Sequence, residues 1–406
     1  MATLRKALFN ATGYAMAIPG MSLVYAPRTE PRSSRVSEAV FGHRNDAPSW
    51  SDDGSEIGSG LDPDAIQSLP AHGWAWEPEI DAWTPALAQL DGGLSAEDPL
   101  RVVSFNVLMD MFEKWVSGVI RTPERHTAIV AWLATLGAHV IVLNEATPEF
   151  VALVVADPYL QANFRLTEVD GEALHPHGVL VLVAHSIPVI SVHKVYSMLL
   201  LRKRCRIKEK AARPVVVVRI ALPSGLVLGV CGVHLASRVK EIAQRRQQLR
   251  DLFRLFALGT SPTGGDGPGV LGVHQALIVG DLNMHSEGEN TMIAAPYADA
   301  WLAVNEEVPL TASCTWDGET NKLIQAMLLG TDKRKMRLDR MLLSAPLAPA
   351  DDGSGRAPGQ ALEVTAMEII GREERVPDTD LTLSDHYGLL AEFSIAPVAP
   401  SDNNDH

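Results

Sequence analysis

Short runs of apolar, mostly β-branched residues recur along this chain, and five of them border a small polar cluster. Runs of this length between turn signals are typical of buried strands. The five clusters are Ser104-Phe105-Asn106, Leu143-Asn144-Glu145, Val233-His234-Leu235, Gly280-Asp281-Leu282-Asn283 and Ser384-Asp385-His386. Carboxylates, amides and imidazoles are costly to bury without partners. We therefore expect the clusters to meet at one rim, where they satisfy a bound ion and one another.

The donor atoms of these clusters are oxygens and imidazole nitrogens. The three cysteines, Cys205, Cys231 and Cys314, lie far apart without metal-binding spacing, which favours a reduced, intracellular protein. Hard oxygen ligands select Mg²⁺, with Mn²⁺ as the alternative, over a structural zinc ion. The clusters together indicate metal-assisted hydrolysis.

Strand and helix patterns beyond residue 100 predict an α/β fold of two packed mixed sheets flanked by helices. The predicted strands cover residues 101–107, 139–143, 162–168, 178–185, 188–194, 214–221, 226–234, 275–280, 336–343, 362–370 and 386–394. The predicted helices cover 122–137, 147–155, 238–257 and 289–294. Gly- and Pro-rich inserts at 259–272 and 345–360 are expected to be surface loops.

Composition divides the chain into an N-terminal extension (1–98), a catalytic domain (99–396) and a disordered tail (397–406). The extension is basic at first, and residues 46–100 then carry twelve Asp or Glu and no Lys or Arg. The formal net charge of −14 is therefore concentrated there, and the remainder is compatible with a nucleic-acid partner. Part of the acidic segment, 46–64, reads as a disordered linker, whereas its aromatic residues Trp74, Trp76 and Trp83 could dock on the catalytic domain.

The same composition bears on location. No apolar stretch approaches the roughly 18 residues needed to span a bilayer, so we expect no stable membrane association. A nuclear or cytoplasmic monomer is favoured. A mitochondrial transit peptide within residues 1–44 is the alternative to a family-specific extension.

The clusters and their order resemble the endonuclease/exonuclease/phosphatase superfamily over roughly Pro99 to Phe393, and within it the tyrosyl-DNA phosphodiesterase 2 family. The second likeness rests on Thr315-Trp316-Asp317 with Asn321 and Arg337-Leu338-Asp339-Arg340, on His234-Leu235-Ala236-Ser237 with Arg246-Gln247-Gln248-Leu249, and on Ser384 to Leu390. Asn144 stands where the superfamily usually has Gln, and Ala236 where the phosphodiesterase has Glu. The resemblance implies a four-layered α/β sandwich and a divalent-metal enzyme that releases tyrosyl adducts from DNA 5′ ends.

Glu145 is the best metal ligand, because an acid directly after the buried run 140–143 needs a cation partner. Asp281 and Asn283 lie two apart, so in an extended segment both would face one water; an Asx-rich turn is the alternative. By resemblance, Asp281 is the general base and Asn283 orients the water. Asn106 contributes to the metal and phosphate environment, and Asp385 approaches the metal or its waters.

The expected roles of His234 and His386 depend on the residues beside them. Asp339 looks like the carboxylate that pairs with His386, fixes its tautomer and raises its pKa, so that an imidazolium faces a phosphate oxygen. His234 would donate to a non-bridging oxygen. Whether Asp281 or His386 takes the proton from water stays open, and analogy favours Asp281.

Cations are expected to bind the substrate. Seven of them lie between Arg202 and Arg213, and a second set is Lys333, Arg334, Lys335, Arg337 and Arg340. Such runs suit phosphate backbones, although a localisation signal or a solvated loop also explains the first run. The predicted contacts are Arg213, Arg238, Ser237 and Trp316, the last stacking a base or tyrosyl ring or else anchoring its loop. Nucleic acid ends are the expected partner, DNA rather than RNA.

Two other function classes fit the same residues. One is a different hydrolase of the superfamily, such as an RNA deadenylase or a lipid or inositol phosphatase. The other is a non-catalytic scaffold that binds nucleic acid or protein. The complete metal-facing set argues against the scaffold, because a decayed site usually loses a carboxylate or a histidine first.

Overall fold

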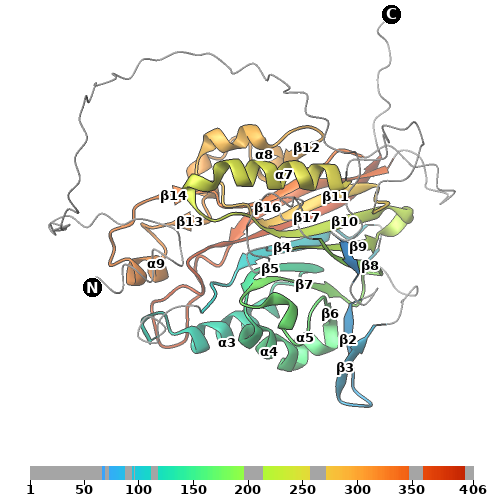
Figure 1. The fold of residues 1–406 in the computed structure, drawn as a ribbon, viewed down its shortest axis with the longest axis horizontal. Coiled ribbons are helices and arrows are strands. Elements are labelled where there is room, and N and C mark those ends of the chain that lie inside the picture. Colours follow the sequence, from blue (N-terminus) through green and yellow to red (C-terminus); the bar gives the residue numbers. More distant parts are fainter. Residues whose placement is uncertain are drawn as a thin grey trace, which may run out of the picture.

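Two mixed β-sheets stack face to face, and helices cover both outer faces (Figure 1). The structure is a computed structural model, and it describes residues 66–68, 73–86, 94–95, 97–110, 118–195, 214–256, 271–346 and 360–397. Several predicted features lie outside these residues: the basic start of the chain, the acidic linker, the basic run 202–213, most of both Gly- and Pro-rich inserts and the tail from 398. In the described residues the predicted α/β fold of two packed sheets is confirmed.

The first sheet has seven strands in the order β1-β8-β9-β10-β11-β15-β12. They are β1 (Ile66–Ser68), β8 (Val189–Val195), β9 (Val215–Ala221), β10 (Val227–His234), β11 (Gln275–Asp281), β12 (Tyr297–Asp299) and β15 (Asp339–Ser344). β10 and β11 are parallel, whereas β15 is antiparallel to β11 and pairs Asp339 with Asp281. The end of β11 and the beginning of β15 therefore lie side by side.

The second sheet has eight strands in the order β16-β17-β4-β5-β7-β6-β2-β3. They are β2 (Trp74–Glu77), β3 (Ala82–Pro85), β4 (Leu100–Asn106), β5 (Val140–Ala146), β6 (Phe164–Leu166), β7 (Gly178–Ala184), β16 (Gln360–Ile370) and β17 (Gly388–Pro397). β4 and β5 are parallel and β17 is antiparallel to β4, which repeats the arrangement of the first sheet. A separate two-stranded sheet pairs β13 (Trp316–Asp317) with β14 (Lys335–Met336).

Helices form the outer layers. α3 (Thr122–Leu133), α4 (Pro148–Ala156) and α5 (Pro158–Asn163) cover the eight-stranded sheet, and α7 (Ile242–Phe256) covers the seven-stranded sheet (Figure 1). α8 (Ala300–Val304) packs against β12, β15 and β16, and its Trp301 belongs to the apolar layer between the sheets. α9 (Lys322–Met327) packs near β13 and β14. Short 3-10 helices are η2 (Glu172–Leu174), η4 (Pro223–Gly225), η5 (Val239–Glu241), η6 (Glu287–Met292) and η7 (Leu310–Ser313). Among the described residues no helix combines the length and apolarity that a bilayer crossing requires.

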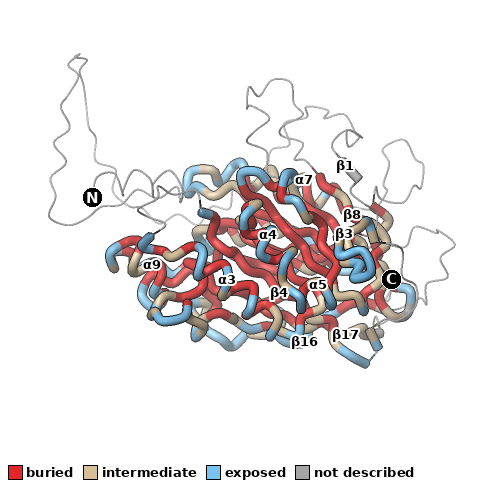
Figure 2. Tube along the Cα trace, turned by 90° about the horizontal axis from the view of Figure 1, so that it is seen from below, coloured by how far each residue is buried: buried red, intermediate tan, exposed pale blue. Residues whose placement is uncertain are grey.

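Three apolar layers hold these elements together. One lies between the sheets, where Val142 and Val181 pack in the same cluster as Val230. The second joins the eight-stranded sheet to α3 and α4, and the third joins the seven-stranded sheet to α7. Figure 2 shows that the central strands are buried along most of their length. Burial of each Val or Leu contributes roughly 1.5 to 3 kcal/mol, so the two-sided burial of these strands fixes their stacking.

Several predicted boundaries were wrong. The helix expected over 122–137 ends at Leu133, because the amides of Thr135 and Leu136 turn back to Trp132 O and Leu133 O and do not continue the α-helical pattern. The helix expected over 238–257 begins as the 3-10 turn η5 before α7. The strand expected over 336–343 divides into β14 and β15, since the amides of Leu338 and Asp339 donate to Thr315 Oγ1 between them.

The chain before residue 99 contributes strands to both sheets. β1 pairs with β8, and Trp74 of β2 pairs with Leu166. Trp76 and Trp83 meet edge to face, and Trp83 Nε1 donates to Val155 O at 3.1 Å. The aromatic segment is therefore docked on the sheet that carries β4 and β5.

One buried amide joins the two sheets at their functional end. Asn144 Nδ2 donates to Val233 O at 2.6 Å, and Asn144 Oδ1 accepts from Asp281 N at 3.1 Å. Gly280 makes this approach possible, because a Cβ there would lie 2.1 Å from Val233 O and 3.1 Å from the Asn144 amide. Asn144 thus sets the position of β11 relative to β5.

We expect Asn144→Ala to lower the free energy of unfolding by about 2 to 4 kcal/mol, because two buried backbone groups lose their partner. Urea denaturation measures the change. Asn163→Ala is the matched control: its amide also donates to a backbone carbonyl, but at an exposed site, so its effect should stay within about 0.5 kcal/mol. Equal effects of the two substitutions would contradict a role for Asn144 in joining the sheets.

Candidate active site

The five polar clusters meet at the shared end of the two sheets. Asn106 Nδ2 at the end of β4 donates to Asp281 Oδ2 at the end of β11, at 3.2 Å. His234 Nε2, at the end of β10, lies 3.6 Å from Asp281 Oδ2 and 3.7 Å from Glu145 Oε1. Ser384 Oγ donates to Asn106 O at 2.6 Å, which brings in the segment before β17. The structure therefore brings polar groups from both sheets into one site.

Glu145 reaches the site through an irregular backbone. It has a φ of 61°, and the pairing of β5 with β7 shifts between Leu143 and Ala146. Its Oε2 accepts from Met109 N at 3.1 Å, and its Oε1 faces His234. A non-glycine residue in the left-handed region is costly, and such positions cluster at functional sites.

Asp281 and Asn283 lie in an Asx turn, so the expected extended segment was wrong. β11 ends at Asp281, Asn283 has a φ of 52°, and Asn283 N donates to Asp281 Oδ1 at 2.8 Å. Asn283 Nδ2 donates to Leu235 O at 3.1 Å. Burial, reinforced by the Asp339 carboxylate and partly offset by His386, raises the pKa of Asp281 to about 7. A carboxylate near this pKa suits a general base at neutral pH.

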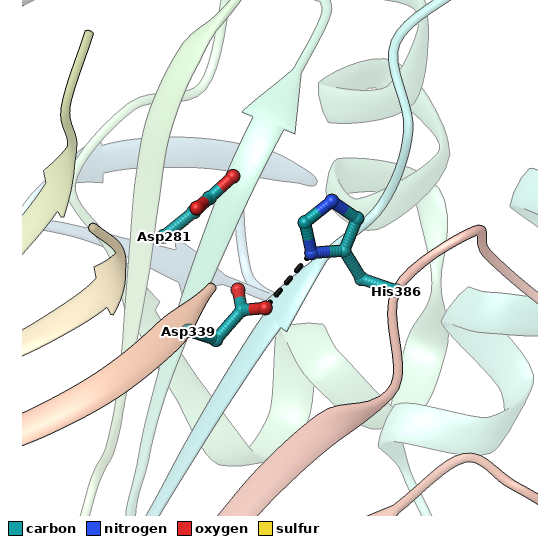
Figure 3. A group of neighbouring side chains, drawn as sticks. All are labelled: Asp281, Asp339 and His386. Carbon is teal, nitrogen blue, oxygen red and sulfur yellow. Dashed lines mark hydrogen bonds and ion pairs between the residues drawn. The ribbon is translucent and has the colours of Figure 1, made fainter. Parts of the chain in front are cut away.

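His386 and Asp339 form the predicted pair. His386 Nδ1 and Asp339 Oδ2 lie 2.8 Å apart, and the second ring nitrogen points away from Asp339 (Figure 3). Burial alone would lower the pKa of His386, but Asp339 at hydrogen-bonding distance, followed by Asp281 and Asp385, raises it well above its ordinary value. The ring is therefore an imidazolium whose second N–H can be offered to an anion.

Asp385 is a further buried carboxylate of the site, and a buried arginine, Arg125, lies near it. Asp385 is 3% exposed, and this burial raises its pKa. Arg125 donates through Nη1 to Val107 O and Leu383 O and through Nη2 to Leu108 O. Burial lowers the pKa of Arg125 to about 10, with Asp385 the strongest opposing charge, so the guanidinium stays cationic at neutral pH. Its hydrogen bonds hold the backbone after β4 and the backbone before Asp385 in position.

The charges leave room for a cation. Four carboxylates, Glu145, Asp281, Asp339 and Asp385, lie near the cations Arg125 and His386, and the ring of His234 lies beside two of them. Carboxylate oxygens of Asp281 and Asp339 lie within 4.8 Å of one another, and Asp339 Oδ1 is buried with no hydrogen-bond partner in the described part of the chain. Buried carboxylate oxygens in excess of cations fit a divalent ion such as Mg²⁺.

The predicted substrate residues are less well placed. Trp316 is 2% exposed and donates from Nε1 to Asp332 Oδ2 at 3.3 Å, so the stacking interpretation was wrong and the tryptophan anchors its loop. The side chain of Arg238 is 52% exposed, 3.7 Å from Glu241, at the start of η5. Ser237 is half-buried, and its carbonyl lies 3.1 Å from His285 Nε2. Arg213 lies outside the described residues.

The second basic set was also expected to present phosphate-binding cations, and most of its members have acidic partners instead. Arg337 and Arg340 are buried against Asp299. Arg334 pairs with Asp332, and Lys335 pairs with Glu319 at 2.9 Å. These neighbouring acids are distant in sequence or lie in turns, so the run of cations by itself did not reveal them.

Sequence reasoning missed three groups at the site. Arg125 was not selected from the sequence, and Thr315 was noted only as part of a motif. His177 lies at the start of β7, with its ring 5.8 Å from that of His234. It borders the apolar run of β7 as a lone histidine, without the acid or amide that accompanies the other clusters or their partners.

The amino-acid sequence was compared with models of protein families and with curated proteins. The model of the Endonuclease/Exonuclease/phosphatase family matches residues 103–386, and the chain belongs to this family. It is thus a hydrolase of the phosphodiesterase and nuclease class. A comparison with curated protein sequences finds no match.

Solved structures of tyrosyl-DNA phosphodiesterase 2 (TDP2) share the fold. Humanized D. rerio TDP2 is 18% identical with a TM-score of 0.51, covering 74% of this chain and 100% of that one. D. rerio TDP2 complexed with single strand DNA product is 18% identical with a TM-score of 0.51, covering 73% and 99%. C. elegans TDP2 is 18% identical with a TM-score of 0.50, covering 73% and 75%.

We expect Asp339→Asn to lower the pKa of His386 in the metal-free protein, because the carboxylate that favours the imidazolium is removed. NMR titration of the His386 ring measures it: the wild-type ring should stay protonated well above pH 6.5, and the variant ring should lose its proton at lower pH. Asp317→Asn, a nearby buried carboxylate that does not contact His386, is the control. Identical titration curves in wild type and D339N would rule out the pairing.

Proposed function

We propose that this hydrolase is a Mg²⁺-dependent phosphodiesterase that removes tyrosyl groups from the 5′ ends of DNA. The observation that carries the proposal is the buried pairing of His386 with Asp339 beside Asp281, at the end where Glu145 and Asp385 also converge. This arrangement offers a base and an oxyanion donor in one water-poor place, next to an unbalanced negative charge. Cleavage of a phosphodiester requires these elements.

Glu145, Asp385 and Asn106 would hold the metal, because they bring carboxylate and amide oxygens to the site from β5, from the segment before β17 and from the end of β4. When bound, Mg²⁺ supplies positive charge for the phosphoryl oxygens and for the departing oxygen. Arg125, behind Asp385, keeps the strand-end carbonyls and carboxylates in position without entering the site.

The proton and the charge are handled by the chain's own residues. Asp281, with its pKa near neutrality, takes a proton from the attacking water, and Asn283 N fixes the orientation of that carboxylate. The His386 imidazolium donates from its second nitrogen to a non-bridging phosphate oxygen, and His234 donates to another. Asp339 keeps His386 protonated throughout.

A tyrosyl leaving group suits a site whose residues act on the attacking water and on the phosphate oxygens. Phenolate, whose conjugate acid has a pKa of about 10, departs far more easily than a sugar alkoxide and does not require a strong general acid. Asp281, Asn283 and His386 act on the water and the phosphate rather than on the leaving oxygen. The fold shared with TDP2, one structure of which contains a single-stranded DNA product, supports DNA as the polymer.

We expect Glu145→Gln and Asp281→Asn to separate metal binding from base catalysis. Glu145→Gln should reduce turnover below roughly a hundredth of wild type and weaken Mg²⁺ binding, because the main anionic ligand is lost. Asp281→Asn should reduce turnover by roughly 10² to 10⁴ with Mg²⁺ affinity little changed. Calorimetric Mg²⁺ titration and initial rates measure both. Glu149→Gln, four residues after Glu145 on the exposed start of α4, is the control for charge alone.

If Mg²⁺ affinity collapses in D281N, Asp281 is a ligand and the assignment of the base is wrong. If E145Q retains wild-type affinity and rate, the metal lies elsewhere. Both variants preserve side-chain volume, so circular dichroism should show an unchanged fold.

The substrate assignment is tested with three substrates at equal concentration: a 5′-phosphotyrosyl oligonucleotide, the same oligonucleotide with a plain 5′-phosphate, and poly(A). We expect tyrosine release to be faster than degradation of either unadducted polymer, because the phenolate is the better leaving group. Mass spectrometry follows tyrosine and the 5′-phosphate product, and EDTA is the control. Degradation of an unadducted polymer without tyrosine release would replace the proposal by a nuclease or deadenylase activity.

A further inference from the structure

A cavity lined by both apolar and charged residues lies beside the catalytic site and shares none of its residues. Its volume is about 90 Å³, and its walls include Arg337, Arg340, Lys335, Ser286, Asn290 and Thr311. Its wall begins at Met284, the residue after Asn283, and includes Arg337, two residues before Asp339. Since one water needs roughly 10 to 15 Å³ of such space, the cavity can hold several waters or one tetrahedral oxyanion.

The buried charges at this cavity do not balance. Arg337 Nη2 lies 3.0 Å and Arg340 Nη1 2.7 Å from the same oxygen of Asp299. The arginines are 7% and 2% exposed, so two buried guanidinium groups share a single carboxylate. Glu287, the acid in the cavity wall, is exposed to solvent. One positive charge at the cavity therefore has no buried counter-charge among the described residues.

Arg337 also has unused hydrogen-bond donors. Its Nη2 donates to Asp299, but its Nε and Nη1 are buried and have no acceptor in the part of the chain that the structure describes. Burial, followed by repulsion from Arg340, lowers the pKa of Arg337, which reflects the same unfavourable environment. A buried guanidinium with two unsatisfied donors is costly unless an anion or ordered water accepts from it.

We propose that this cavity binds a phosphate group, which acts as the missing counter-ion of the Arg337–Arg340–Asp299 cluster. Guanidinium groups match the oxygens of phosphate with parallel hydrogen bonds. The hydroxyls of Ser286 and Thr311 and the amide of Asn290 provide further donors in the wall. The phosphate comes either from solution or from a bound oligonucleotide, at a position other than the one that is cleaved. Only the second source rests on the function proposed above.

Calorimetric titration of the full-length protein with inorganic phosphate, at fixed Mg²⁺, tests the cavity. We expect Arg337→Gln to weaken phosphate binding about tenfold or more, because a charge-assisted contact is lost while Asp299 keeps Arg340 as partner. Arg334→Gln is the matched control: it removes a cation from the same segment that pairs with Asp332 and does not line the cavity, so phosphate binding should be unchanged.

Two further variants make the result decisive. Thr311→Trp adds bulk at an exposed wall position, so it should fold normally and block the same binding. His234→Ala removes a hydrogen-bond donor of the catalytic site. Phosphate binding that is retained in H234A but lost in R337Q and T311W therefore belongs to the cavity. The proposal would be overturned if T311W binds phosphate with wild-type affinity while R337Q either also binds phosphate with wild-type affinity or fails to fold.

The source of the phosphate is resolved by kinetics. If the oligonucleotide supplies it, R337Q should raise KM for a 5′-phosphotyrosyl oligonucleotide about tenfold and leave KM for the 4-nitrophenyl ester of a single thymidine 5′-phosphate unchanged. If solution phosphate is the ligand, both KM values stay at wild type while the calorimetric site is still lost. An equal change in both substrates would show that Arg337 acts on the catalytic centre and would contradict a separate site, whatever the fate of the proposed tyrosyl activity.

Discussion

The rest of the site depends on negative charge that is buried where two sheets end together. Four carboxylates meet there, and their mutual repulsion in a water-poor environment is large unless cations intervene. The described residues include the His386 imidazolium and the Arg125 guanidinium, and the His234 ring lies beside Glu145 and Asp281. Burial, reinforced by the neighbouring Asp339 carboxylate, raises the pKa of Asp281 to about 7. The same imbalance that destabilises the empty site therefore makes it a binding site and provides a base.

The architecture produces this concentration of charge by using one strand arrangement twice. In each sheet two parallel strands end at the site and an antiparallel strand starts beside them, β4 and β5 with β17, and β10 and β11 with β15. The Asn144 amide then holds the two sheet ends together. The backbone is irregular at two functional residues, because Glu145 and Asn283 both have positive φ. Such conformations lower the stability of the folded protein and are found most often at functional sites.

Much of this could be predicted from sequence because the signals are local. A buried run bordered by an acid or a histidine gave the central strands: Glu145 and Asp281 stand at strand ends, and Asp339 and His386 at strand starts. Contacts between distant segments left no such signal. The acids that pair with Arg337 and Lys335, the helix position that puts Arg125 behind Asp385, and the burial of Trp316 all depend on tertiary packing. The short helices α5, α8 and α9 were missed because six or fewer residues show no helical periodicity.

The central claim is that the buried carboxylates require a divalent cation, and the stability of the whole chain reports on it directly. We would strip the protein with EDTA and record its midpoint of thermal unfolding at pH 7 during Mg²⁺ titration, with matched ionic strength in NaCl. The account predicts a midpoint that rises with Mg²⁺ and not with NaCl. At a Mg²⁺ concentration a hundred times the dissociation constant, the free energy of unfolding should have increased by about 2.7 kcal/mol. A midpoint that responds equally to both salts would contradict it.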